Sequence, residues 1–246
     1  MNVRRLQPVS GRISKPPRVE SRVTLDASVA SEVRRRIVSL EYEPGVMIYE
    51  NAISEEFRVS RTPVHHAFLQ LMREGLLEIL PQRGARVSYL SLDTVKKAQY
   101  MRECLEAAAF ADAARIYDAG NSEHGAWLLR LKRLTDEQIA DIEANQSMGF
   151  VELDAAFHNE VLNLVGNELL IDTVNQMRNH LNRVRFLELR TVHHEREMHR
   201  HHLQLIDLLT AKDAEGARIF LIAHLKVLEA ERDAILSQYP QYFEEG

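Results

Sequence analysis

The sequence predicts a mainly α-helical protein, with an N-terminal winged helix-turn-helix domain and a C-terminal all-α antiparallel helical bundle. Three observations predict this fold class. Apolar residues repeat at helical spacing through most of the chain, two short strand patterns flank the turn "PQRG", and proline is absent from residues 93–239. The 246 residues are enough for two domains, each with its own core.

Charge and cysteine content narrow the class of protein. The net charge of −5 divides unevenly, because residues 1–92 carry +4 and residues 93–246 carry −9. A basic first part joined to an acidic remainder indicates two domains with different partners. Cys104 is the single cysteine, which excludes a disulfide framework and fits a reducing cytoplasm. Without a transmembrane-length apolar run or a signal-peptide core, the sequence predicts a cytoplasmic protein with no membrane partner.

Composition shifts divide the chain into four parts. Residues 1–23 hold six Arg or Lys, three Pro and one acid, which is typical of a flexible basic arm. Residues 24–92 form the predicted winged helix-turn-helix domain. Residues 93–240 form the predicted all-helical domain for effector binding and dimerisation, and residues 241–246 are a tail.

The first domain reads as three helices followed by a hairpin. The helices are expected from Ala27 to about Leu40, from Glu50 to Phe57 and from about Pro63 to Glu74, with Gly75 as the residue after the last helix. The segments "LLEIL" and "ARVSYL" around "PQRG" then predict a two-stranded β-ribbon. In a winged helix-turn-helix of this order, the second helix of the pair enters the DNA major groove with its N-terminus first.

The start of the third helix carries the DNA prediction. In "VSRTPVHHAF", Ser60 and Thr62 are N-cap residue types, and Pro63 suits the first helical position. Arg61, His65 and His66 then lie at the helix end where the macrodipole disfavours positive charge. This placement makes sense if that end of the helix faces a polyanion.

The motifs "PGVMI", "SRTPV" and "EGLLEILPQRGARV" resemble the GntR transcription regulators over residues 26–92. The resemblance implies DNA contacts from Arg61, Thr62 and the wing residue Gly84, and Ser60 and Arg83 complete the expected DNA-binding set with His65. The chain departs from the family where "PVHHAF" replaces "PVREAL", so that His65 stands in place of a base-reading arginine. Histidine lacks the bidentate fork of arginine, so we expect an altered half-site, unless His65 makes no base contact.

Inward-facing polar residues interrupt three of the apolar stripes of the second domain. Asp154 and His158 lie four residues apart on one stripe, His202 interrupts a second and His224 a third. A single such histidine is most often a core residue bonded to a carbonyl. Three with a carboxylate suit a divalent metal ion such as Zn, Ni or Mn, because a buried charge needs a partner.

The segments "LDAAFHNEVLNLVGNELL" and "HHLQLIDLLTAKDAEGARIFLIAHL" resemble the FadR C-terminal domain (FCD) branch of the GntR family. The resemblance implies a metal ion beneath a cavity for a small organic acid, with Asp154, His158, His202 and His224 as ligands. His201 is the alternative to His202. The other nearby histidines, His193, His194 and His199, are expected at the exposed start of a helix.

The same branch often has an arginine in the pattern R-x-x-x-E, here Arg102 and Glu106. A guanidinium binds both oxygens of a carboxylate, so Arg102 is the main candidate for effector binding. Arg183 and Arg185 are further candidates. The alternative for Arg102 is a surface ion pair with Glu106.

Together these features predict a homodimeric transcriptional regulator that is not an enzyme. We expect it to bind a pseudo-palindromic double-stranded DNA operator, and a small carboxylate effector to modulate that binding. Two alternatives remain open at this point. One is a metal-dependent hydrolase that activates water at the Asp/His cluster, and the other is a regulator that senses the metal ion itself.

Overall fold

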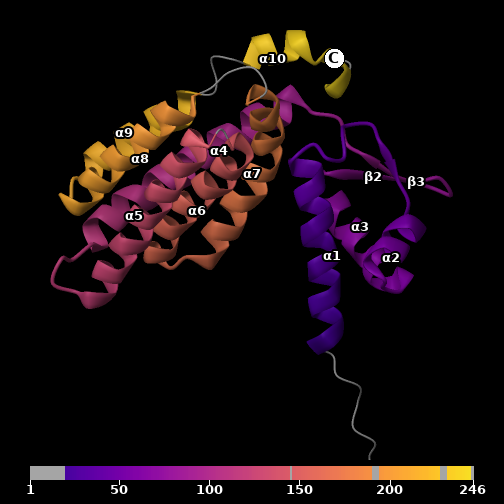
Figure 1. Ribbon diagram of the computed structural model, residues 1–246, viewed down its shortest axis with the longest axis horizontal. Coiled ribbons are helices and arrows are strands. Elements are labelled where there is room, and N and C mark those ends of the chain that lie inside the picture. The colour runs from indigo at the N-terminus through magenta and orange to yellow at the C-terminus, as the bar shows by residue number, and fades with distance from the viewer. Residues whose placement is uncertain (1–19, 145, 190–193, 228–231, 245–246) are drawn as a thin grey trace, which may run out of the picture.

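The structure, a computed structural model, describes residues 20–144, 146–189, 194–227 and 232–244. Its N-terminal domain contains three helices and a small sheet (Figure 1). The elements are α1 (Glu20–Val38), β1 (Met47–Ile48), α2 (Glu50–Phe57), α3 (Arg61–Arg73), β2 (Leu77–Leu80) and β3 (Gly84–Val87). This order confirms the predicted winged helix-turn-helix.

The core of this domain forms because each helix buries one apolar stripe. Val33 and Ile37 of α1 pack with Phe68 and Leu71 of α3, and all four are at most 1% exposed. The sheet covers the same core in the order β1-β3-β2, with both pairs antiparallel. The strand β1 was not predicted, because two residues are too short to show an alternating pattern.

The wing turn requires glycine at residue 84. Gly84 has φ +98°, and a Cβ atom there would lie 2.9 Å from the carbonyl oxygen of Ile48. Backbone and steric reasons therefore both exclude a larger residue at this turn. Gly75 plays a related part at the end of α3, where its φ of +72° lets the chain leave the helix.

The second domain is an antiparallel bundle, as predicted (Figure 1). Its helices are α4 (Leu92–Ile116), α5 (Ser122–Glu143), α6 (Ser147–Val165), α7 (Glu168–Glu188), α8 (Glu195–Thr210) and α9 (Ala214–Lys226), followed by α10 (Arg232–Gln238) and the 3₁₀ turn η2 (Pro240–Tyr242). The helix α4 packs against α6, α7, α8 and α9. Side chains at the N-caps of α4, α5, α7 and α9 (Ser91, Asn121, Asn167 and Asp213) accept backbone N–H groups and so fix where these helices begin.

The end of the described chain returns to the connection between the two domains. Leu90 and Phe243 form a parallel bridge, in which the Leu90 N–H donates to the Tyr242 carbonyl at 2.8 Å and the Glu244 N–H donates to the Leu90 carbonyl at 3.0 Å. Tyr242 and Phe243 are buried. Residues 241–246 were predicted to be a tail, but residues 242 and 243 belong to the core around the domain junction.

Some predicted boundaries differ from the observed ones. The helix α1 begins at Glu20, so the predicted basic arm of residues 1–23 overlaps its first turn; residues 1–19 lie outside the described residues. The helix α3 begins at Arg61, which places Pro63 at the third helical position and not at the first. Proline is tolerated there because N–H groups of the first turn have no helical partner. Within the described part of the chain, no helix is long and apolar enough to cross a bilayer.

Candidate DNA-binding face and metal centre

The N-terminus of α3 and the wing share one open cleft. This cleft has a volume of about 880 Å³, and Arg61, Arg83 and Gly84 line it together with residues of β1 and the start of α2. Arg61 and Arg83 are exposed, and so are Ser60 and Thr62 beside them. Ser60 is the N-cap residue of α3, although its side chain makes no capping hydrogen bond. The structure therefore brings together the residues predicted to bind DNA.

The two histidines of α3 each face a carboxylate. The Nδ1 atom of His65 lies 2.8 Å from Oε1 of Glu50, at the start of α2. The Nδ1 atom of His66 lies 2.9 Å from Oδ2 of Asp26 on α1. Both imidazoles are more than half exposed. His65 thus lies on the accessible face. Its acidic neighbour, Glu50, would also attract an arginine at this position.

The four predicted metal ligands converge at the centre of the bundle. Asp154 and His158 come from α6, His202 from α8 and His224 from α9, and each is at most 3% exposed. One ligand atom from each residue can be chosen so that all four lie within 4.8 Å of one another. This spacing is compatible with a single divalent cation between them.

Hydrogen bonds to the outer ring nitrogens determine which nitrogens point inward. The Nδ1 of His158 lies 2.5 Å from Oε2 of Glu106, and the Nδ1 of His202 lies 2.9 Å from Oε1 of Gln138. Both oxygens are acceptors, so each Nδ1 carries the proton and each Nε2 presents a lone pair.

Among the described residues, the inward lone pair of His202 has no proton donor, whereas that of His158 can accept a proton only from His224. The Nε2 of His202 lies 3.3 Å from Oδ1 of Asp154, and the Nε2 of His158 lies 3.1 Å from the Nε2 of His224. Asp154 Oδ1, His202 Nε2 and His224 Nδ1 are buried without a hydrogen-bond partner. A lone pair that faces a carboxylate oxygen is repelled unless a cation lies between them, so the donor set fits a metal ion.

Burial favours the neutral form of the imidazoles, which leaves a lone pair free to bind a metal ion. Burial lowers the pKa of His202 to about 4 and the pKa of His224 well below its ordinary value. For Asp154, burial acts to raise the pKa, but Arg185, His202 and His158 together more than offset it, so the pKa lies well below the usual range. The site therefore holds neutral imidazoles beside an ionised carboxylate, which is the state that a metal ion requires of its ligands.

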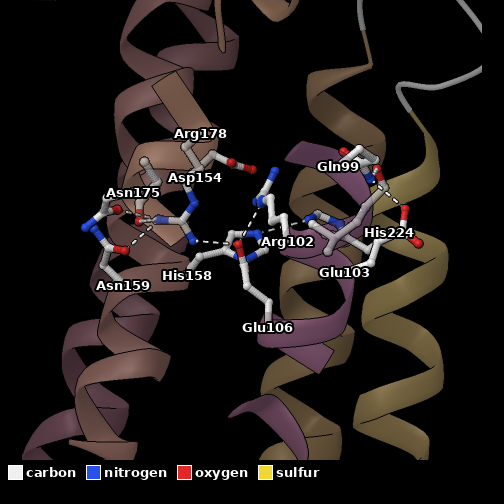
Figure 2. A network of polar contacts seen from close by, with 12 residues as sticks. Gln99, Arg102, Glu103, Glu106, Asp154, His158, Asn159, Asn175, Arg178 and His224 are labelled. Carbon is white, nitrogen blue, oxygen red and sulfur yellow. Dashed lines mark hydrogen bonds and ion pairs between the residues drawn. The ribbon is translucent and has the colours of Figure 1, made fainter. Parts of the chain in front are cut away.

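Glu106 of α4 connects the metal-ligand cluster to two arginines, as Figure 2 shows. Its Oε1 accepts the Nε–H of Arg102 at 2.6 Å and an Nη2–H of Arg178 at 3.0 Å. The ion pair between Arg102 and Glu106 that the alternative expected does form, but it is buried and does not lie at the surface. The burial of Glu106 tends to raise its pKa, but the two guanidinium groups keep the pKa well below the ordinary value.

The three arginines predicted to bind the effector lie in two different cavities. Arg102 and Arg185 both line a small cavity of about 30 Å³ between α4 and α7, and Arg185 donates from Nη1 to Asp154 Oδ2 at 2.5 Å. Arg183 lies in a different cleft, where it donates from Nη2 to the carbonyl oxygen of Ser88.

Sequence reasoning missed two residues that complete the network. Gln138 follows Trp127 and Leu131 on the inward stripe of α5, and Arg178 follows Val174 on that of α7. Their positions on these stripes were the available signal, because a polar residue at helical spacing from buried apolar ones must find a partner inside.

The remaining histidines of the region lie outside the cluster. His201 is partly exposed and lies against Phe220, whereas its neighbour His202 is fully buried. His194 is the N-cap residue of α8, and His199 is half-buried on the same helix. His193 falls outside the described residues.

Comparisons with known proteins agree with this architecture. The sequence pattern of the FCD domain matches residues 99–227, and that of the "bacterial regulatory proteins, gntR family" matches residues 25–87. The HTH-type transcriptional repressor RspR of Escherichia coli K12 is 30% identical over 213 residues, which cover 87% of this chain and 91% of that protein. The Nta operon transcriptional regulator of Aminobacter aminovorans is 26% identical over 207 residues, which cover 82% and 94%.

Two solved structures share the fold. Escherichia coli McbR/YncC superposes with a TM-score of 0.75 at 19% sequence identity and covers 87% of this chain and 98% of its own. A transcriptional regulator from Rhodococcus sp. RHA1 superposes with a TM-score of 0.70 at 21% identity, covering 88% and 99%. At such identities the likeness concerns the arrangement of helices and strands.

Proposed function

Because this chain belongs to the GntR family of bacterial regulatory proteins and carries an FCD domain, and is therefore a DNA-binding transcriptional regulator, we propose that a small organic acid modulates its operator affinity. The acid binds in the helical bundle beside a divalent metal ion. The protein acts in the cytoplasm as a homodimer, and its two copies of α3 enter half-sites about one helical turn apart on a pseudo-palindrome.

The observation that carries this proposal is the set of inward donor atoms in the bundle. Asp154, His158, His202 and His224 place four potential ligand atoms within 4.8 Å of one another, all of them buried. Imidazole nitrogens with one carboxylate suit Zn²⁺, Ni²⁺ or Mn²⁺. When bound, the ion supplies a positive centre to which a carboxylate oxygen can attach.

Arg102 and Arg185 are the residues that would hold the rest of the acid. Both line the cavity of about 30 Å³, and Arg185 connects this cavity to the cluster through its hydrogen bond to Asp154. That volume holds about one or two water molecules, so a carboxylic acid enters only if the cavity widens. The cavity wall includes Val95 and Gln99 of α4 and Leu181 of α7, so widening separates these two helices.

Widening of this cavity would be transmitted directly to the DNA-binding domain. The helix α4 begins at Leu92, directly after the residues that connect the two domains, and α7 packs against α1. Movement of α4 or α7 therefore changes the position of the winged helix. A coupling of about 1–3 kcal/mol changes operator affinity roughly 5- to 150-fold.

Two measurements test the proposal in sequence. Selection of bound DNA from a random duplex library should enrich an inverted repeat, and titration of that operator should then be repeated with metal-loaded protein and a panel of small organic acids. An acid that changes operator affinity in the metal-loaded protein but not after substitution of Arg102 supports the proposal. If no acid in a broad panel acts, effector modulation at this site is wrong.

The small size of the cavity favours one second candidate, in which the metal ion is itself the effector. Treatment with chelator followed by Zn²⁺, without any organic acid, should then switch DNA binding. The metal-dependent hydrolase is disfavoured because the relatives are transcriptional regulators. Turnover of a panel of esters by metal-loaded protein would revive it.

A further inference from the structure

Arg183 is a buried cation at the junction of the two domains. It lies on α7, is 1% exposed, and donates from Nη2 to the backbone carbonyl of Ser88 in the connecting segment. Its Nε atom is buried and has no hydrogen-bond partner in the described part of the chain. Among those residues, one neutral acceptor therefore serves a side chain with five N–H groups.

No carboxylate among the described residues forms an ion pair with Arg183. Burial alone lowers its pKa, to about 10, without a contribution from a neighbouring charge. A guanidinium that loses its water without gaining an anion is costly, and buried charges in proteins are normally paired. The position therefore lacks a counter-ion.

Arg183 forms part of the wall of a cleft of about 490 Å³ between the domains. Gly75 at the end of α3 and Ser88 line it from the DNA-binding domain, while Thr94 on α4 and His180 on α7 line it from the bundle. The cleft is large enough for a small organic or phosphorylated molecule. A ligand here would touch both domains and the segment that connects them.

The acidic residues on the rim are engaged elsewhere or face solvent. Glu74 accepts two hydrogen bonds from Arg34, at 2.7 and 2.6 Å, and Glu78 accepts one from Arg86 at 2.6 Å. Glu244 is exposed and bonds through its backbone N–H to Leu90. None of these three carboxylates therefore neutralises the positive charge of Arg183.

We propose that the interdomain cleft binds a small molecule bearing a carboxylate or phosphate group, with the guanidinium of Arg183 as its principal ligand. This site is separate from the metal centre, since Arg183 does not line the cavity of Arg102 and Arg185. It is also separate from the DNA-binding face, because Gly75 follows the C-terminus of α3 and Arg61 begins it. The 13 residues of α3 span roughly 20 Å.

Titration calorimetry with inorganic phosphate and with succinate tests the proposal. The full-length protein is first treated with chelator and dialysed, so that neither anion can bind through a metal ion. At least one of the two anions should bind saturably, and Arg183→Met should weaken that binding at least about tenfold. Arg218→Met, which removes an arginine paired with Glu215 on α9, should leave the affinity unchanged.

A second variant keeps the test decisive if Arg183→Met fails to fold. Thr94→Glu places a carboxylate in the wall of the cleft at the third position of α4, where glutamate is favoured, and should abolish anion binding. Ala108→Glu adds the same charge at an exposed position of α4 outside the cleft and should not.

Preference for phosphate or for succinate identifies the anionic group of the ligand, and either result supports the proposal when it depends on Arg183 or Thr94 as stated. Absence of saturable binding of both anions overturns it, and so does binding that Arg183→Met and Thr94→Glu leave unchanged. A loss caused equally by Ala108→Glu would show a general charge effect and would likewise overturn it. Because the readout is anion binding without metal or DNA, failure here leaves the proposed effector site untouched.

Discussion

The Nδ1 atom of His158 and the Oε2 atom of Glu106 lie 2.5 Å apart, in a pair that is completely buried. Glu106 is not itself a member of the metal-ligand cluster. Because its carboxylate accepts the Nδ1 proton, it directs the other nitrogen of His158 toward His224. One carboxylate of α4 thus orients a ligand on α6 while it also pairs with two arginines.

Glu106→Gln should lower the affinity for a divalent metal ion about 10- to 100-fold, because the orienting acceptor loses its charge. Competition against a chromogenic chelator measures the affinity. Glu103→Gln is the matched control, since Glu103 lies one turn earlier on α4 and contacts Gln99 and Lys226 outside the cluster. Equal affinities for the Glu106→Gln variant and the unaltered protein would show that Glu106 does not orient His158.

His202→Ala and His201→Ala should behave oppositely. His202 lies in the cluster and is fully buried, whereas the adjacent His201 is partly exposed. Elemental analysis after dialysis should find the metal retained by the His201→Ala variant and largely lost from the His202→Ala variant. The reverse pattern would mean that His201 is the ligand and that the helix register of α8 is wrong at this point.

Arg178→Met should destabilise the fold by about 3–5 kcal/mol, because it removes one of the two guanidinium partners of a fully buried carboxylate. Urea denaturation measures the free energy of unfolding. Arg130→Met removes a partly exposed partner of Glu160 and should cost at most about 1 kcal/mol. Similar losses for the two variants would contradict the role of Arg178 in compensating the charge of Glu106.

The metal-free protein should lose stability as the pH falls from about 6.5 to about 4. Burial lowers the pKa of His202 from an ordinary 6.5 to about 4. Between these values the unfolded chain binds a proton at this histidine that the folded chain excludes, so acidification favours unfolding. Urea denaturation at several pH values should give a shallower dependence for His202→Gln. An unchanged dependence would show that His202 does not titrate as stated.

His65→Arg should change the base preference of the selected operator, because arginine can bond guanine bidentately and histidine cannot. Sequencing of DNA retained from a random library by both proteins provides the comparison. His66→Arg should have little effect on the selected sequence, since the ring of His66 faces Asp26 on α1. Identical operators for the protein and its His65→Arg variant would place His65 away from the bases.

The architecture was largely predictable because local signals and burial agree. The glycines at residues 75 and 84 stand where the backbone has positive φ, and the inward stripes of the bundle repeat at helical spacing over long segments. The convergence of Asp154, His158, His202 and His224 followed from the same stripes. Positions that depend on partners far apart in the sequence, such as the bond between Gln138 and His202, could not be assigned from one helix at a time.

Arg183 and Arg185 show where local reasoning failed. Both were predicted to bind one effector, yet they line different cavities. Two residues separated by two positions on an α-helix point about 200° apart, so they face nearly opposite sides. Both are buried because α7 lies at the edge of the bundle beside the DNA-binding domain, packing against α4 on one side and α1 on the other (Figure 1).

The bridge between Leu90 and Phe243 also bears on the biogenesis of the protein. About 150 residues separate the two partners along the chain, and domains generally begin to fold from the N-terminus during synthesis. The winged helix can therefore form while the bundle is still being translated, but its attachment to the bundle is completed only after the ribosome has released Phe243. Until then a nascent chain can hold a folded DNA-binding head whose contacts with the bundle are incomplete.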